Sequence, residues 1–210
     1  MSWWVSLISY LSVFSAVPAI WLGRKQQGLL WYYAWASFLS DIIPFVQRRL
    51  SGSVWYVQGN LFYLCELILV GLFFIREIPS RLWRRVVLGV IVLIAAFFLV
   101  RAWPHINTEV NWPDVVFGSF ALMLLCIAAL FKVIRNVEHL KIEQSPLFVF
   151  SACFLLYVAY SLLLMLFTEQ FKQAPKSLRL NIWSVHNVLN SLKNLAIARV
   201  FTMRRKAALS

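Results

Sequence analysis

The chain has 210 residues, of which 61% are apolar and 13% are charged, whereas an ordinary soluble domain is about 45–50% apolar and about 25% charged. A water-soluble globule cannot cover so many apolar side chains, so a lipid bilayer must be the main solvent of this chain. The net charge of +12 would suggest nucleic-acid binding in a soluble protein, but in a membrane protein Lys and Arg first report topology.

Seven segments are long and apolar enough to cross a bilayer, for which a helix needs about 20 mostly apolar residues. They are residues 3–22, 28–47, 54–75, 82–103, 114–134, 146–167 and 181–202. The connections are short and rich in charged and turn residues, so residues 1–210 are predicted to form one all-α, seven-transmembrane-helix bundle. The first span has no basic segment before it and is too long for a signal-peptide core, so we expect it to be retained, although Ser15-Ala16-Val17 resembles a cleavage site.

Lys and Arg are distributed unequally between the two ends of these spans. Thirteen lie in the first, third and fifth connections and at the C-terminal end, six lie in the other three connections, and the twentieth is Lys193 within the last span. Because cytoplasmic loops are enriched in Lys and Arg, this pattern predicts a multi-pass protein of the cell membrane with its N-terminus outside and its C-terminus in the cytoplasm. The bilayer is thus the expected partner of the positive charge, and no nucleic-acid partner is expected.

Polar side chains are concentrated in three of the seven spans. Span 82–103 has no hydrogen-bonding side chain in its middle and is predicted to lie at the periphery. Polar groups in hydrocarbon are costly, about 2.5–3.5 kcal/mol for a charge at the helix centre, so they are expected to face the bundle interior. Spans 28–47, 54–75 and 181–202 are therefore predicted to meet around Asp41, Gln58, Asn60, Glu66, His186, Asn187, Asn190, Lys193 and Asn194.

These residues fall at two depths. Glu66 and Lys193 each lie about twelve residues into spans that run in the same direction, which places both near the midplane and predicts an ion pair, with Asn194 beside it. The outer layer contains the others, namely Asp41, Gln58, Asn60, His186, Asn187 and Asn190. Three interpretations stay open at this point: a structural network that joins three helices, a ligand or ion site, and a catalytic site.

A short sequence similarity between two spans suggests an internal repeat. The segments Trp55–Leu67 and Trp183–Leu195 align without gaps, with matching Trp, Val and Leu positions and polar residues at two shared positions. Two three-helix repeats separated by one linker helix would have the same orientation, and such parallel repeats place a substrate site at their interface. This 3+1+3 plan resembles the small sugar and amino-acid carriers of the SWEET and PQ-loop kind, although the chain lacks their Pro-Gln pair. A small-solute transporter is therefore the alternative function.

Lys193 in the last span, with Glu66 at a matching depth, resembles the Schiff-base lysine and counter-ion of retinal proteins. Microbial rhodopsins place an Asp four residues before that lysine, where this chain has Leu189. The last span therefore departs from the retinal-protein pattern at this position, and no cofactor is predicted.

Two families of seven-span lipid enzymes also share single features with the chain. Alkaline ceramidases need three converging histidines around zinc, but His105, His139 and His186 fall in an outer connection, a cytoplasmic connection and a span. Lysoplasmalogenase-like enzymes use paired intramembrane Asp, and Asp41 is the only Asp inside a span. An intramembrane lipid-modifying enzyme that uses Glu66 or Asp41 with His186 stays a further alternative, but no metal ligand and no catalytic residue is predicted.

The segment from Asn60 to Glu66 and the pattern His186-Asn187-x-x-Asn190-x-x-x-Asn194 loosely resemble uncharacterised seven-helix bacterial proteins akin to the membrane-sensor regions of some histidine kinases. This resemblance implies a non-enzymatic membrane protein that senses a small or lipidic ligand, or a membrane subunit of a larger assembly. No effector domain is expected after Arg204-Arg205-Lys206, so such a sensor would act through a membrane or cytoplasmic protein partner.

Overall fold

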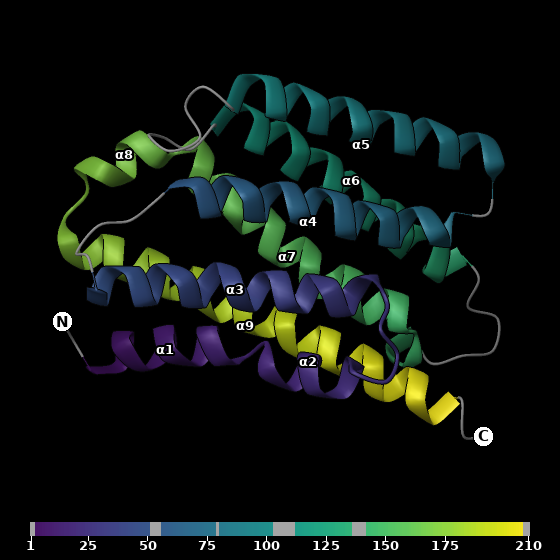
Figure 1. Ribbon diagram of the computed structural model, residues 1–210, viewed down its shortest axis with the longest axis horizontal. Coiled ribbons are helices and arrows are strands. Elements are labelled where there is room, and N and C mark those ends of the chain that lie inside the picture. Colours follow the sequence, from purple (N-terminus) through teal and green to yellow (C-terminus); the bar gives the residue numbers. More distant parts are fainter. Residues whose placement is uncertain (1–2, 51–55, 79, 103–111, 136–141, 208–210) are drawn as a thin grey trace.

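The computed structural model describes residues 3–50, 56–78, 80–102, 112–135 and 142–207, which are helical throughout apart from short turns and contain no strand. The helices run roughly along one common axis, and the two ends of the chain lie at opposite ends of it (Figure 1). In chain order the elements are α1 (Trp3–Phe14), α2 (Val17–Gly23), α3 (Leu29–Leu50), α4 (Tyr56–Glu77), α5 (Arg81–Ala102), α6 (Trp112–Arg135), the 3₁₀ turn η2 (Ile142–Gln144), α7 (Pro146–Leu166), α8 (Thr168–Gln173) and α9 (Lys176–Ala207).

Six helical segments of the described chain are long and apolar enough to cross a membrane, so a multi-pass membrane protein is plausible. They are Trp3–Gly23, Leu29–Gln47, Val57–Glu77, Arg81–Arg101, Val115–Arg135 and Pro146–Leu166, which coincide within a few residues with the first six predicted spans. The first segment is broken into α1 and α2 by a turn at Ser15 and Ala16, and Pro18 stands at the start of α2. Proline is favoured in the first turn of a helix, where its missing N–H costs no hydrogen bond.

The seventh predicted span corresponds to α9, which is the longest helix at 32 residues. At 1.5 Å per residue it extends about 48 Å, which exceeds the roughly 30 Å thickness of the hydrocarbon core. α9 is not among the six apolar segments, because many of its residues are polar. Several of those polar side chains are buried, including Ser184, Asn190, Lys193 and Asn194. The low hydropathy of α9 therefore reflects both this buried polar side and the exposed basic residues near its two ends.

The helices form a ring with one helix outside it. α1 and α2 pack on α3, α3 on α4, α4 on α6, α6 on α7, and α7 on α9, which returns to α1 and α2. α5 lies outside this ring against α4 and α6, at the upper edge of Figure 1. Its side chains are the least buried of the six apolar segments. The predicted peripheral position of span 82–103 is confirmed by this arrangement.

Spans 28–47, 54–75 and 181–202, which were predicted to meet around their polar residues, all contribute polar side chains to one cavity, but they are not all closely packed on one another. α3 packs closely on α4 but touches α9 only briefly, and α4 and α9 are not packed neighbours within the described residues. The polar face of α9 is covered mainly by α1, α2 and α7, and it also makes hydrogen bonds to Ser37 and Asp41 of α3. The sequence argument did not give this order of packing, because it matched depths along the membrane normal, and depth carries no information on the order of helices around the ring.

An aromatic cluster joins the C-terminal end of α4 to the first half of α7. Phe73 and Phe74 of α4 contact Phe150 of α7 with ring centroids 5.0 and 5.7 Å apart, and Phe150 stacks on Phe154 at 5.3 Å. These four side chains are at most 4% exposed. Edge and offset contacts of this kind stabilise a pair by about 0.5–1.5 kcal/mol beyond the burial of apolar area. None of these four rings lines the cavity described next, whose lining begins further along α7, at Tyr157.

Candidate functional site

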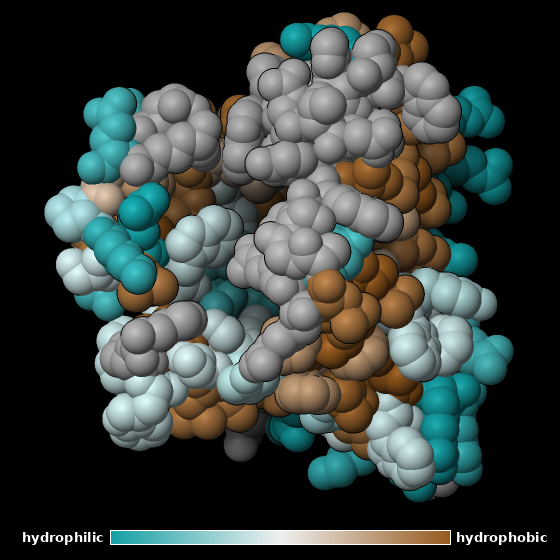
Figure 2. Space-filling model, turned by 60° about the vertical axis from the view of Figure 1, so that its left-hand side comes forward, coloured by the Kyte–Doolittle hydropathy of each residue, from teal (hydrophilic) through white to brown (hydrophobic). Residues whose placement is uncertain are grey.

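A cavity of about 600 Å³ lies inside the bundle and is lined by residues of α3, α4, α6, α7, α8 and α9. The surface is hollowed in the view of Figure 2, where hydrophilic residues lie at the bottom of the hollow beside hydrophobic ones. Most of the lining is apolar or aromatic, which is typical of small-molecule sites, where a few polar groups orient the ligand. The polar side chains that line it include Asp41, Glu66, Ser119, Ser161, His186 and Asn190.

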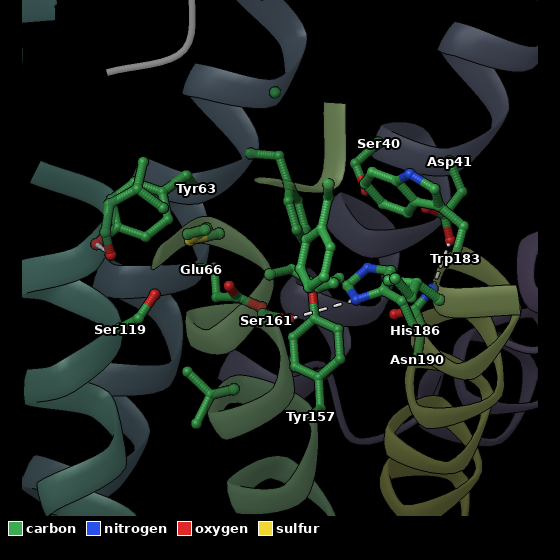
Figure 3. Close-up of a pocket in the computed structure, with 18 of the residues that line it drawn as sticks. Ser40, Asp41, Tyr63, Glu66, Ser119, Tyr157, Ser161, Trp183, His186 and Asn190 are labelled. Atoms are coloured by element: carbon green, nitrogen blue, oxygen red, sulfur yellow. Dashed lines mark hydrogen bonds between the residues drawn. The ribbon is translucent and has the colours of Figure 1, made fainter. Parts of the chain in front are cut away.

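These polar groups come from opposite sides of the cavity. Asp41, His186 and Asn190 lie on one side, whereas Glu66 and Ser119 lie on the other (Figure 3). The predicted candidates Asp41, Glu66, His186 and Asn190 are thus brought to one cavity, although they lie on three different helices. The remaining predicted residues, which are Gln58, Asn60, Asn187, Lys193 and Asn194, do not line it.

Asp41 of α3 is held in place from α9. Its Oδ2 accepts a hydrogen bond of 2.9 Å from Nδ2 of Asn190, which also donates to Oγ of Ser12 at 3.0 Å. Pro44 lies three residues further along α3. Because proline has no N–H, it cannot make the helical hydrogen bond to the carbonyl of Ser40, a residue that also lines the cavity. The Asp41 carboxylate and the Ser40 carbonyl therefore both offer hydrogen-bond acceptors on this side of the cavity.

Glu66 and Lys193 do not form the predicted ion pair. Both side chains are buried, at 6% and 0% exposure, but the ion pairs between described residues do not include one that joins them. Oε1 of Glu66 instead accepts a 2.5 Å hydrogen bond from the hydroxyl of Tyr33. The Lys193 ammonium donates to Oγ of Ser37 at 3.2 Å and lies 4.2 Å from the ring centroid of Tyr157. Depth matching was insufficient because α3 and α7 place aromatic rings around the ammonium.

A ladder of serine–asparagine hydrogen bonds joins α9 to the first span. α1 and α9 run in the same direction (Figure 1), so side chains three or four residues apart on one helix face their counterparts on the other. The bonds run from Asn187 to Ser9 at 3.2 Å, from Asn190 to Ser12 at 3.0 Å, and from Asn194 to Ser15 at 2.9 Å. Oδ1 of Asn194 also accepts from Ser37 of α3 at 3.2 Å. Asn187 and Asn194 therefore serve as structural links between helices.

His186 lies among aromatic rings at one end of the cavity. Its ring centroid is 5.5 Å from those of Tyr157 and Trp183, and its Nδ1 is 3.5 Å from Oγ of Ser161. A serine nucleophile needs an adjacent base that a third group orients. Within the described residues His186 has no hydrogen bond or ion pair to a carboxylate. The Ser161–His186 pair therefore lacks the third member of a hydrolytic triad.

The two remaining candidates lie on α4, away from the cavity lining. Asn60 is completely buried, and the buried Oε1 of Gln58 has no hydrogen-bond partner among the described residues. His105 and His139 lie outside the described residues. Within the described chain, no three His, Cys, Asp or Glu side chains come close enough to hold a metal ion.

Sequence reasoning missed the residues that complete the site. Tyr33, Tyr157 and Ser161 surround the charged groups, and Ser9, Ser12 and Ser15 form the partner side of the ladder. The three-residue spacing of these first-span serines was a usable signal, since it puts them on one helix face. The tyrosines gave no signal, because a single aromatic residue in a membrane helix is ordinary. Comparison with known proteins adds no family to this picture: no protein-family model, curated protein or solved structure matches the chain.

Proposed function

We propose that this protein is a multi-pass membrane receptor without enzymatic activity, which binds a small or lipidic ligand inside its bundle and signals through a protein partner. The single observation that carries the proposal is the cavity of about 600 Å³ with polar groups on opposite walls. Ligand sites typically occupy about 300–1,000 Å³ and combine apolar walls with a few convergent polar groups. A purely structural bundle has no need of such a space.

The path of α9 supports signalling. His186 and Asn190 line the cavity, and the same helix continues to the opposite end of the bundle, where Arg204, Arg205 and Lys206 end its last turn. A ligand that binds better to one position of α9 shifts the population toward that position, and the far end of the helix moves with it. The serine–asparagine ladder holds α9 against the first span in one defined position, from which a ligand can shift it. The resemblance to sensor regions of histidine kinases, which rests on the sequence alone, agrees with this role.

We further propose that α9 is the seventh span and that the N-terminus lies outside a bacterial inner membrane, as the excess of Lys and Arg on the other side suggests. A reporter fused to the C-terminus is expected to be active in its cytoplasmic form, such as a fluorescent protein, and inactive as an alkaline phosphatase. The matched control is the same pair of reporters fused after residue 175, in the connection before α9. The opposite activities at that position are expected, and identical activities at both positions would contradict a membrane-crossing α9.

The order of the ring favours a small-solute carrier as the second candidate. The first three spans pack in chain order, as do the last three, and the two groups meet where α4 touches α6 and where α9 touches α1 and α2. α5 lies outside, as a linker between two three-helix units would. The cavity lies between the two groups, which is where parallel repeats place a substrate.

Filling the cavity tests the proposed function. The protein purified in native lipid is expected to retain a stoichiometric small molecule, detectable by mass spectrometry, and Ser161→Phe is expected to lose it. Ser161 is 6% exposed and lines the cavity, so a phenyl ring there competes with any ligand. Ser177→Phe is the control, because Ser177 is exposed in the first turn of α9. Equal retention by both variants, or none by the unaltered protein, would contradict the proposal; uptake of the molecule into proteoliposomes would favour the carrier.

A further inference from the structure

The described buried side chains around the cavity include more acidic groups than basic ones. Asp41 and Glu66 line it, and in the described part of the chain Lys193 is the only Lys or Arg side chain that is fully buried. Arg179 also lines the cavity, but its side chain is exposed near the start of α9 and is therefore solvated. One acidic group is thus left without a buried basic counterpart.

Lys193 contacts a serine and three aromatic rings rather than either carboxylate. Lys193 donates to Ser37, and its ammonium lies 4.2, 5.0 and 5.8 Å from the ring centroids of Tyr157, Tyr33 and Phe62. In the described part of the chain no cationic nitrogen lies within 4.0 Å of either Asp41 or Glu66. From the described residues, Asp41 accepts a hydrogen bond from Asn190 and Glu66 accepts one from Tyr33, whereas a carboxylate can accept about four. Both groups therefore keep acceptor capacity at the cavity.

The walls beside these carboxylates indicate an organic rather than an inorganic cation. Phe62, Tyr63, Tyr157, Phe171 and Trp183 contribute to the lining, and an ammonium over an aromatic face gains about 0.5–2 kcal/mol. A bare metal cation needs several oxygen ligands at short range, whereas the two carboxylates come from opposite walls of a space of about 600 Å³ (Figure 3). That space holds a molecule of drug-like size.

From this geometry we infer that the cavity binds an amphipathic amine, whose protonated nitrogen lies against Glu66 or Asp41 and whose apolar part contacts the aromatic walls. The inference rests on the proposed function and names the chemical class of its ligand. The carboxylates supply the charge-assisted acceptors that an ammonium requires. The hydroxyls of Ser119 and Ser161, which also line the cavity, offer it further acceptors.

Three probes with one skeleton test the inference: 4-phenylbutylamine, 4-phenylbutan-1-ol and 4-phenylbutanoate, which are cationic, neutral and anionic near neutral pH. Binding is measured by titration calorimetry on the full chain in lipid nanodiscs, with empty nanodiscs as the blank for partitioning. The amine is expected to bind about tenfold to a hundredfold more tightly than the alcohol, the gain typical of a hydrogen bond to a charged group. The anion is expected to bind more weakly than the alcohol.

Glu66→Gln is expected to reduce the affinity for the amine about tenfold and to leave the affinity for the alcohol unchanged. Glutamine keeps an acceptor for Tyr33, so folding is not at risk from this bond. The control is Glu77→Gln. Glu77 is a partly exposed carboxylate at the C-terminal end of α4, outside the cavity lining, and its Oε2 lies 3.9 Å from Nζ of Lys132. Asp41→Asn is the second variant, and its affinities for the amine and the alcohol test the inference if Glu66→Gln does not fold.

Each outcome separates the inference from the function on which it rests. Equal binding of amine and alcohol would overturn the inference and leave a ligand-binding cavity in place. Tighter binding of the anion would overturn it and identify Arg179 as the recognising group. If none of the three probes binds but a small molecule still co-purifies, the ligand belongs to another chemical class and the inference is overturned. If no probe binds and no small molecule co-purifies, the proposed function is contradicted as well.

Discussion

Replacement of Lys193 by methionine is expected to destabilise the bundle by about 3–5 kcal/mol, since removal of one member of a buried charge set leaves the others uncompensated. Lys193 is completely buried, and among the residues that the structure describes no other Lys or Arg side chain is fully buried. The substitution also removes the ammonium from the rings of Tyr33 and Tyr157. Methionine has a similar length and fills the space, so the loss reports charge rather than volume.

The measurement is unfolding in mixed micelles with an increasing fraction of SDS. Glu66→Gln alone leaves Asp41 and Lys193 as one acid and one base. It is expected to lower the free energy of unfolding by about 1 kcal/mol, the value of one altered hydrogen bond. The double variant, Glu66→Gln with Lys193→Met, is expected to recover part of the loss. Lys132→Met is the control, because Lys132 is 36% exposed and exposed ion pairs contribute about 0–1 kcal/mol. Equal effects of Lys193→Met and Lys132→Met would contradict the buried charge set.

Gly118→Ala is expected to destabilise the contact between α6 and α4 by about 2–4 kcal/mol, from overpacking and a lost hydrogen bond. A Cβ on Gly118 would lie 1.8 Å from the hydroxyl oxygen of Tyr63, so the tyrosine must move. Tyr63 is 5% exposed, donates to the carbonyl of Val115 at 2.9 Å, and packs on Phe98 with ring centroids 5.5 Å apart. Its displacement would break that hydrogen bond and alter the cavity that Tyr63 lines.

Thermal unfolding in detergent provides the comparison for this substitution. Gly89→Ala on α5 is the matched control, because a Cβ there has no neighbour within 4 Å. It is expected to be neutral or to stabilise by up to about 1 kcal/mol through helix propensity. Adding Tyr63→Phe to Gly118→Ala removes the clashing hydroxyl and is expected to restore part of the stability. Equal midpoints for Gly118→Ala and Gly89→Ala would show that the close approach of the two helices is absent.

Much of the architecture follows from the sequence by itself. Apolar runs of about 20 residues predict spans because lipid offers no partner for backbone polar groups, so each run must satisfy its hydrogen bonds as a helix. Six of the seven predicted spans are helices of that kind. The peripheral position of α5 followed from a run that lacks polar side chains, and the inward direction of Asp41, Glu66 and Asn190 followed from the cost of polar groups in hydrocarbon.

Only the tertiary structure decided which of these groups meet. Depth along the membrane normal follows from residue count, since each helical residue advances 1.5 Å, but the order of helices around a ring depends on packing between surfaces. Lys193 accordingly donates to Ser37 and lies beside the rings of Tyr33 and Tyr157, whereas Glu66 accepts a hydrogen bond from Tyr33. The cavity depends on the same packing: it is the space left where five ring helices fail to close, and no single helix contains the information for it.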